Sequence, residues 1–261
     1  MQVANFKIEQ KSRSDRFDFI FMGDIHAGSA SFARDYFERM IDWLSDQETY
    51  YVIGMGDYME NTPPDHKNFD FEHVDRDLLT TEDQYQYILE QFGKIKSRIV
   101  GLIEGEHDER TTPLTGHSWV RHLCHELECP YLGESAFFRI TFQRINERRS
   151  WDFYVCHGRY SGRTFGGAMN KIISLGNDWN ADVLAMGGTH FMGMTTLPRM
   201  ELNNNCNLVK RRRAFLLTGT YLESYQENVT SYAEQKQYSP QKVGSPKVKI
   251  WPTSGDLHVS E

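Results

Sequence analysis

Residues 18–26 read DFIFMGDIH, a short apolar run that ends in Gly-Asp-x-His. The run at 18–22 has the length of a buried β-strand and is far too short to span a membrane as a helix. In the extended segment that follows, side chains two positions apart leave the backbone on the same side, so Asp24 and His26 are able to bind one metal ion together. The pattern predicts a strand that presents metal ligands at its carboxyl end.

The same arrangement recurs along the chain. Glycine beside a carboxylate or an imidazole follows four further predicted strands, at Gly56-Asp57, Gly105-Glu106-His107-Asp108, His157-Gly158 and Gly187-Gly188-Thr189-His190. Ligands of open α/β sheets bind beyond the carboxyl ends of the strands, and glycine lets the backbone approach a ligand closely. Carboxylates combined with imidazoles suit Mn, Fe or Zn. Each short motif is common alone, but five in order predict a shared metal site.

The hydrophobic periodicity predicts one α/β domain in which helices pack on a sheet, with a last third that is mainly strand. The expected helices lie at 31–47, 82–95, 118–128 and 168–175. The expected strands lie at 18–22, 50–55, 99–103, 136–143, 151–156, 182–186, 195–202, 209–218 and 247–251. A polar segment at 144–150 predicts the turn of a hairpin.

The composition limits the classes of protein to which the chain can belong. The chain has 261 residues, of which 39% are hydrophobic and 13% aromatic, so it is able to bury a sizeable core and does not resemble a disordered chain. The net charge of −7 argues against a polybasic binder but leaves room for a local basic groove. No membrane span and no signal-peptide core are visible, so we expect a cytoplasmic protein without membrane association.

The four cysteines are few for this length, which fits a reducing compartment. Two of them lie close to histidines in the order His122, Cys124, His125 and Cys129. This spacing fits neither common zinc pattern. We therefore interpret the segment as an ordinary helix, with a zinc site as the less favoured alternative.

The ordered motifs Asp24-x-His26, Gly56-Asp57, Gly105-x-His107-Asp108, His157 and Gly187-x-x-His190 together resemble the five-block pattern of the calcineurin-like metallophosphoesterase superfamily. The resemblance covers about residues 17–192, and the segments at 56–61 and 105–110 are similar to members encoded by phages and prokaryotes. It implies a single domain over residues 1–261 with a four-layer α/β/β/α sandwich, whose second sheet the β-rich C-terminal part completes. It also implies a dinuclear metal centre and hydrolysis of phosphate esters.

The resemblance assigns a role to each motif residue. Six residues would hold two divalent ions: Asp24, His26 and His190 the first, Asp57 both, and His157 with Glu106 the second. His107 would be the catalytic histidine near the leaving group, and Asp108 would orient it. Water activated by the metals would attack phosphorus in line. Mn²⁺ is the expected ion, with Fe, Zn, Mg or Ni as alternatives.

Two positions depart from the family pattern, and both concern the second metal. Glu106 stands where the family has asparagine, and Gly188 stands where it has the first histidine of Gly-His-x-His. Either Glu106 compensates for the lost imidazole, because a carboxylate can bind bidentately and adds charge, or the second site is weak or empty. We favour compensation. The ligands would then be harder and would favour Mn²⁺ or Mg²⁺ over Zn²⁺.

Three arginines are candidate substrate contacts: Arg110, Arg159 and Arg163. The last two lie in the glycine-rich segment 158–167, which runs into a predicted helix, and a helix N-terminus favours anions. A guanidinium binds phosphate bidentately. The alternative is a surface loop with solvated arginines.

Two further segments bear on the substrate. The basic run at 210–213 could contact a nucleic-acid backbone, although we prefer to interpret it as a charged strand edge that resists pairing. The loop at 61–75 contains His66, His73, Phe69 and Phe71 and could cover the site. Its aromatic rings would either stack on bases or pack the loop down.

The expected function is metal-dependent hydrolysis of a phosphodiester in DNA, RNA or a nucleotide. The alternatives are a phosphomonoesterase that acts on a protein or a small molecule, and a catalytically weak relative that binds nucleic acid or a partner. The sequence indicates neither the physiological substrate nor the oligomeric state.

Overall fold

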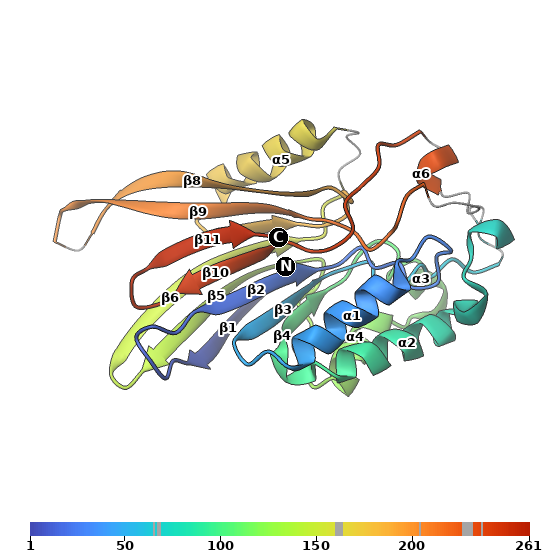
Figure 1. The fold of residues 1–261 in the computed structure, drawn as a ribbon, viewed down its shortest axis with the longest axis horizontal. Helices are drawn as coiled ribbons and strands as arrows, with labels where there is room; N and C mark the ends of the chain where they lie inside the picture. Colours follow the sequence, from blue (N-terminus) through green and yellow to red (C-terminus); the bar gives the residue numbers. More distant parts are fainter. Residues whose placement is uncertain (65, 67–68, 160–163, 204, 226–231, 236) are drawn as a thin grey trace.

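Two β-sheets pack face to face, and helices cover the outer face of each (Figure 1). The computed structural model describes residues 1–64, 66, 69–159, 164–203, 205–225, 232–235 and 237–261. One sheet has five strands in the order β11-β10-β2-β3-β4, and the other has six in the order β1-β5-β6-β7-β9-β8. The four-layer α/β/β/α sandwich expected from the resemblance is thus confirmed.

The five-stranded sheet has a parallel centre and an antiparallel edge. Its strands are β2 (Phe17–Met22), β3 (Tyr50–Met55), β4 (Ile99–Ile103), β10 (Lys247–Trp251) and β11 (Asp256–Ser260). Three helices cover its outer face: α1 (Arg34–Ser45), α2 (Thr81–Gly93) and α4 (Trp119–Glu126). Shorter turns lie in its connections: η1 (Phe71–His73), η2 (Arg76–Leu78), η3 (Lys96–Arg98) and α3 (Thr112–Thr115).

The six-stranded sheet contains both long hairpins. Its strands are β1 (Gln2–Glu9), β5 (Ser135–Arg144), β6 (Glu147–Cys156), β7 (Val183–Met186), β8 (Met192–Leu202) and β9 (Leu208–Thr218). Helix α5 (Phe165–Asp178) covers its outer face, and the short α6 (Tyr232–Gln235) precedes β10. The C-terminal strands divide between the sheets, because β8 and β9 extend this sheet whereas β10 pairs with β2 in the other.

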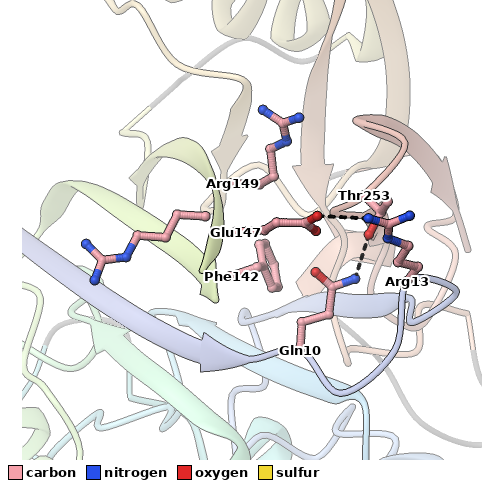
Figure 2. A pocket seen from close by; sticks show the side chains of 7 residues that line it. Gln10, Arg13, Phe142, Glu147, Arg149 and Thr253 are labelled. Atoms are coloured by element: carbon pink, nitrogen blue, oxygen red, sulfur yellow. Dashed lines mark hydrogen bonds and ion pairs between the residues drawn. The ribbon is translucent and has the colours of Figure 1, made fainter. Parts of the chain in front are cut away.

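At one end of the sandwich the β1–β2 connection meets the turns of two hairpins (Figure 2). Gln10 donates a hydrogen bond to Thr253 at 2.9 Å, and Arg13 pairs with Glu147 at 3.0 Å. These contacts join the connection to the β10–β11 turn and to the start of β6. They close the end that lies away from the carboxyl ends of the parallel strands.

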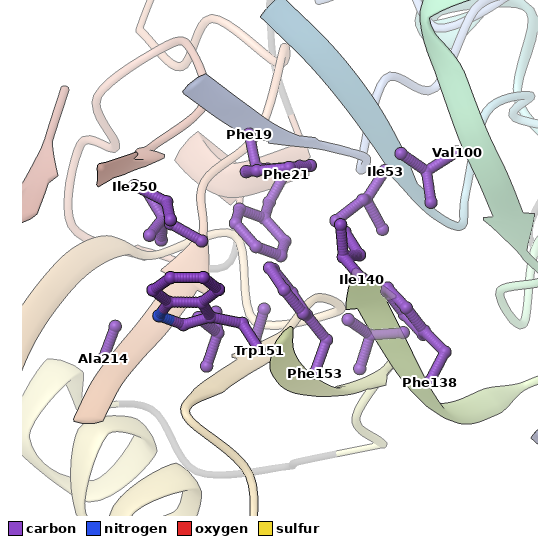
Figure 3. Close-up of a cluster of buried hydrophobic side chains, with 14 of the residues drawn as sticks. Phe19, Phe21, Ile53, Val100, Phe138, Ile140, Trp151, Phe153, Ala214 and Ile250 are labelled. Carbon is purple, nitrogen blue, oxygen red and sulfur yellow. The ribbon is translucent and has the colours of Figure 1, made fainter. Parts of the chain in front are cut away.

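The main core lies between the two sheets (Figure 3). Phe19 and Phe21 of β2 point into it, and the Phe153 ring of β6 lies with its centroid 5.4 Å from that of Phe19. The alternate residues Ile20 and Met22 face the helices instead. Because both faces of β2 are covered, residues 19–22 form one apolar run rather than an alternating pattern.

The structure also corrects several expected elements. Strands β1 and β11 were not predicted, and the polar segment at 144–150 is mostly strand, with only Ile145 and Asn146 between β5 and β6. The alternating Ala4, Phe6 and Ile8 pack against the core, but polar residues separate them and weaken the signal. Among the described residues, no helix is long and apolar enough to cross a membrane.

Candidate metal centre

The five predicted strand-end motifs meet at one end of the sandwich. Strands β2, β3 and β4 are parallel neighbours, and so are β6 and β7, so their carboxyl ends point the same way. The segments beyond β2 and β3 also stay paired, because the Asp24 and His26 amides donate to the carbonyls of Gly56 and Asp57 at 2.9 and 3.0 Å. Both sheets therefore supply side chains to one place.

The backbone at this place is unusual. Asp24, His26, Asp57 and His190 have positive φ angles of 49°, 53°, 53° and 57°. Residues other than glycine seldom adopt this conformation, and such strain concentrates at functional sites. The four strained residues are all predicted metal ligands.

A glycine allows the strand ends to come this close. A Cβ atom at Gly105 would lie 2.1 Å from the Asp57 Oδ1 atom. Any other residue at this position would push apart the segments that follow β3 and β4. The glycine in the third motif is therefore needed for packing within the centre.

The first group of candidate ligands joins both sheets. The Nε2 atom of His190 lies 3.2 Å from Asp24 Oδ1 and 3.3 Å from His26 Nε2. The other ring nitrogen of His26, Nδ1, lies 3.0 Å from a Glu60 carboxylate oxygen, which can only accept when ionised. The proton of a neutral His26 ring therefore sits on Nδ1, and Nε2 is left as a ligand.

The second group is built around His157. Its Nδ1 atom donates to the Met55 carbonyl at 2.7 Å, which fixes Nε2 as the free nitrogen. Nε2 then faces two carboxylates, at 3.1 Å from Asp57 Oδ2 and 2.9 Å from Glu106 Oε2. The Glu106 side chain is 46% exposed, so this group opens toward solvent.

This donor set fits two divalent cations. Asp24 Oδ1 and His157 Nε2 are buried and have no hydrogen-bond partner in the part of the chain that the structure describes. A lone pair that faces carboxylate oxygens without a proton between them is costly unless a cation lies there. One ligand atom from each of Asp24, His26 and His190 lies within 4.8 Å of the others, and the same holds for Asp24, Asp57 and His157.

The electrostatics of the cluster favour positive charge. Burial would raise the pKa of Asp57, but His157, His107 and His26 hold the pKa of this carboxyl well below its usual range. Burial would lower the pKa of His157, but Asp57 and Glu106 raise it well above its usual value, so the position at Nε2 favours a positive charge, either a proton or a metal ion. The Asp57 carboxylate therefore stays ionised and attracts a cation.

A carboxylate that the sequence analysis did not single out contacts the candidate catalytic histidine. The Nδ1 atom of His107 donates to the Glu60 carbonyl at 3.0 Å and lies 3.4 Å from the Glu60 carboxylate. Burial would lower the pKa of His107, but Glu60 raises it to about 9. The His107 amide also donates to Asp57 Oδ1 at 2.8 Å, which ties the histidine to the predicted bridging ligand.

Asp108 has different contacts from those we expected. Its carboxylate is buried and accepts backbone hydrogen bonds from Asp57, Gly105, Tyr58 and Met59 at 2.7–3.4 Å. It therefore holds the segments after β3 and β4 together, whereas the side chain that meets the His107 ring is Glu60. The difference arises because the side chain points back into the strand ends.

We predict that Asp108→Asn lowers the free energy of unfolding by about 2–5 kcal/mol, because the amide nitrogen would face N–H donors and leave them unsatisfied. Urea unfolding in EDTA measures this without any contribution from bound metal. Asp42→Asn is the matched control, since Asp42 is 65% exposed and pairs only at the surface with Lys94. Equal midpoints for the two variants would contradict the structural role.

The second departure from the family pattern has a steric cause. Gly188 has a φ of +66°, and a Cβ atom there would lie 2.3 Å from the Gly158 carbonyl oxygen. The backbone of this loop thus leaves no room for a histidine at position 188. Its amide instead donates to Asp24 Oδ2 at 3.0 Å.

The candidate substrate contacts are only partly available. Arg110 donates to the Glu60 carbonyl at 2.9 Å and is 16% exposed, so it lies beside the centre but is already held. Arg159 pairs with Glu109 at 2.7 Å and Glu134 at 3.4 Å. Arg163 lies outside the described residues.

The alternatives raised for other segments can also be placed. Among the described residues, His122, Cys124, His125 and Cys129 do not form a group of close ligand atoms. The loop before η2 lies against the segment that follows His26, because the Ala30 amide donates to the His73 carbonyl at 2.9 Å. In this loop the Phe69 and Phe71 rings pack edge to face, and Phe71 is 71% exposed.

These features are typical of a metal-dependent phosphoesterase, and the sequence comparison agrees with that class. The model of the calcineurin-like phosphoesterase family matches residues 17–195, and the chain belongs to this family. Membership of this family and the carboxylate and imidazole groups described above support a metal-dependent phosphoesterase. No curated protein matches the sequence.

Solved structures show a distant likeness. A predicted phosphoesterase from Streptococcus pneumoniae TIGR4 is 13% identical, covers 90% of this chain and 84% of its own, and gives a TM-score of 0.35. A double mutant of Vps29 from Entamoeba histolytica is 13% identical over 94% of this chain and 97% of its own, with a TM-score of 0.40. Vps29 from Chaetomium thermophilum is 12% identical over 94% and 93%, with a TM-score of 0.38.

Proposed function

We propose that this protein is a dinuclear metal-dependent phosphodiesterase that acts on nucleic acid or a nucleotide. The observation that carries the proposal is the convergence of three imidazole Nε2 atoms and three carboxylates at the strand ends. The Nδ1 atoms of His26 and His157 are held by acceptors, so both rings present their free nitrogens to the same cluster.

In this proposal, Asp24, His26 and His190 hold one ion, His157 and Glu106 hold the other, and Asp57 lies between them. The ions would activate water and neutralise charge on the phosphoryl oxygens. Mn²⁺ is the proposed ion, because carboxylates and imidazoles together suit it and Glu106 adds a hard ligand.

In this proposal His107 acts on the leaving group, and Glu60 positions His107. His107 would assist the departing oxygen, and it is held in place by Asp57 at its amide and by Glu60 at its ring. Glu60 also binds the outer nitrogen of His26, so one carboxylate positions both the catalytic histidine and a ligand. Arg110 lies on the same segment and would contact a phosphate oxygen.

The charges around the centre favour a diester over a monoester. A phosphomonoester carries about two negative charges near neutral pH, as phosphorylated side chains do, whereas a diester carries one. Among the described residues, Arg110 and Arg159 are each already paired with glutamate, which leaves His107, whose pKa is raised to about 9, as the cation that contacts the centre. Glu106 adds an exposed carboxylate at the opening. Beyond the metal ions and His107, a second substrate charge would therefore meet little compensation from this chain.

Hydrolysis of two chromogenic substrates tests the proposal. With Mn²⁺, we expect the protein to hydrolyse bis-p-nitrophenyl phosphate and to prefer it to p-nitrophenyl phosphate in kcat/KM. A preference for the monoester would make the protein a phosphomonoesterase. If neither substrate reacts with any of Mn²⁺, Mg²⁺, Zn²⁺ or Ni²⁺, the enzymatic proposal is wrong.

A substitution tests the second ion separately. We predict that Glu106→Gln reduces bound Mn²⁺ from about two ions per chain to about one, because His157 Nε2 would lose the nearer of the two carboxylates that lie within 3.1 Å of it. Elemental analysis after Mn²⁺ loading and desalting measures the stoichiometry. Glu109→Gln is the matched control, since Glu109 pairs with Arg159 instead. A single ion in the unmodified protein would show that Glu106 does not compensate.

A further inference from the structure

Basic side chains are concentrated on two hairpin ends. Segments 143–150 and 197–212 contain seven lysines and arginines but two carboxylates, while the rest of the chain has 22 basic and 34 acidic residues. Both segments include the amino ends of strands, β6 and β9, that run parallel to β7. They therefore lie at the end of the sandwich opposite the metal centre, and the β8–β9 hairpin projects beyond the body (Figure 1).

Some of the lysines and arginines on these hairpins already contact other parts of the protein, and others do not. Arg213 donates to the carbonyls of Gly176, Trp179 and Ala181, so it caps the end of α5. Arg211 pairs with Glu201 at 2.5 Å. The basic run is therefore only partly available for a partner.

Four exposed cations remain on the two hairpin ends. No ion pair forms, among the residues that the structure describes, at Arg148, Arg149, Lys210 and Arg212. Unpaired, exposed arginines suit phosphate, which a guanidinium binds through two parallel hydrogen bonds. Two of these cations extend from each hairpin.

The β5–β6 hairpin adds a hollow to this surface (Figure 2). It measures about 360 Å³ and lies between the start of β6, the β1–β2 connection and the β10–β11 turn. Arg149 lines it, and so does Arg13, whose guanidinium is shared with Glu147. Arg148 lines it as well, so the hollow is a polar recess with two guanidinium groups that form no ion pair among the described residues.

The β8–β9 hairpin is a two-stranded ribbon with basic and aliphatic side chains on one face. In its register Met200 lies opposite Lys210, and Leu202 lies opposite Leu208. Met200 is 55% exposed and both leucines are 67% exposed. A two-stranded ribbon fits the major groove of a duplex, and proteins that bind duplexes also insert aliphatic side chains between base steps.

We infer that these two hairpins bind the phosphate backbone of double-stranded DNA and tether it to the enzyme away from the metal centre. The inference rests on the proposed function, because a tether is useful only if the protein hydrolyses nucleic acid. It would then raise the local concentration of the polymeric substrate. Its chemical basis is the complementarity between a basic end and a polyanion. An anionic membrane fits less well, since insertion of the ribbon tip would take the exposed polar residues Asn203, Asn205 and Asn207 out of water.

Fluorescence anisotropy with a labelled DNA duplex of about 30 base pairs tests the inference in EDTA, where the duplex is not cleaved. We expect binding at about 50 mM salt that weakens steeply toward about 200 mM. The double variants Arg148→Gln/Arg149→Gln and Lys210→Gln/Arg212→Gln should each weaken binding at least about tenfold and reduce the salt slope by about 1.8. Thermal midpoints of the variants check that they fold.

The control is Arg39→Gln/Lys96→Gln, which removes the same charge from α1 and η3, outside the two hairpins. The inference is wrong if the unmodified protein does not bind the duplex, or if the control weakens binding as much as the hairpin variants. It is also wrong if vesicles rich in phosphatidylserine, and not DNA, bind in a way that depends on the hairpin cations. Hydrolysis of bis-p-nitrophenyl phosphate needs metal and no polymer, so the proposed function and the tether can each fail alone.

Discussion

Asp57→Asn should lose nearly all phosphodiesterase activity and most bound Mn²⁺. Asp57 presents one carboxylate oxygen to His157 and the other to the His107 amide, so it connects the candidate ligands to the candidate catalytic histidine. Loss of a group that only supports metal ligands costs about 10–100-fold in activity or metal affinity. We expect a larger loss for Asp57, at least about 1,000-fold in kcat with bis-p-nitrophenyl phosphate.

The variant separates catalysis from folding. Asparagine keeps the size of the side chain and an oxygen for the His107 amide, so the variant should still fold, with a urea midpoint in EDTA lowered by loss of the Asp57–His157 pair. Asp75→Asn is a useful control, because Asp75 pairs with Arg34 at 2.6 Å outside the centre. If Asp57→Asn kept two Mn²⁺ ions and normal turnover, the proposed centre would be in the wrong place.

His107→Asn should keep both ions and lose about 10²–10⁴-fold in kcat, the range for general acid–base catalysis. The His107 ring contacts Glu60 and stacks edge to face on His26, and it is absent from the two ligand groups built on Asp24. Metal content by elemental analysis and kcat with bis-p-nitrophenyl phosphate check the two halves of this prediction.

A comparison of two substrates, bis-p-nitrophenyl phosphate and a dinucleotide, tests the role of His107 more specifically. p-Nitrophenolate departs easily, whereas the alkoxide of a dinucleotide needs a proton. The loss of kcat in His107→Asn should therefore be larger for the dinucleotide, because proton donation by His107 matters more for a poor leaving group. An equal loss for both substrates would argue for a binding role, and His125→Asn on the exposed side of α4 is the matched control.

Much of the fold could be predicted because its signals are local. The apolar run of β2 and the polar residues after it are contiguous, and parallel strands bring such ends together. Strands β1 and β11 were missed because edge strands are half exposed and carry many polar residues. The helix expected at 31–47 begins only at Arg34, since the Ala33 amide instead donates to the Tyr221 carbonyl far along the chain.

The site was less predictable where partners are distant in sequence. Glu60 lies in the quoted segment 56–61, yet its contact with His107 spans 47 positions and has no local signal. The ion pairs of Arg159 could not be predicted for the same reason, because its partners Glu109 and Glu134 are 50 and 25 positions away. The side chain of Asp108 could not be placed from the sequence because its acceptors are used by backbone amides.

The division of the ligands between two sheets has a consequence for the newly made chain. Asp24, His26 and Asp57 leave the ribosome long before His157 and His190, and the gap between His26 and His190 is more than 160 residues. At about 5–20 residues per second this is a delay of roughly 10–30 s. The emerging chain first offers mainly oxygen ligands, which suit Mg²⁺. In the proposed centre, only the finished chain would have the set of imidazoles that favours a transition metal, so the ion would be selected after synthesis.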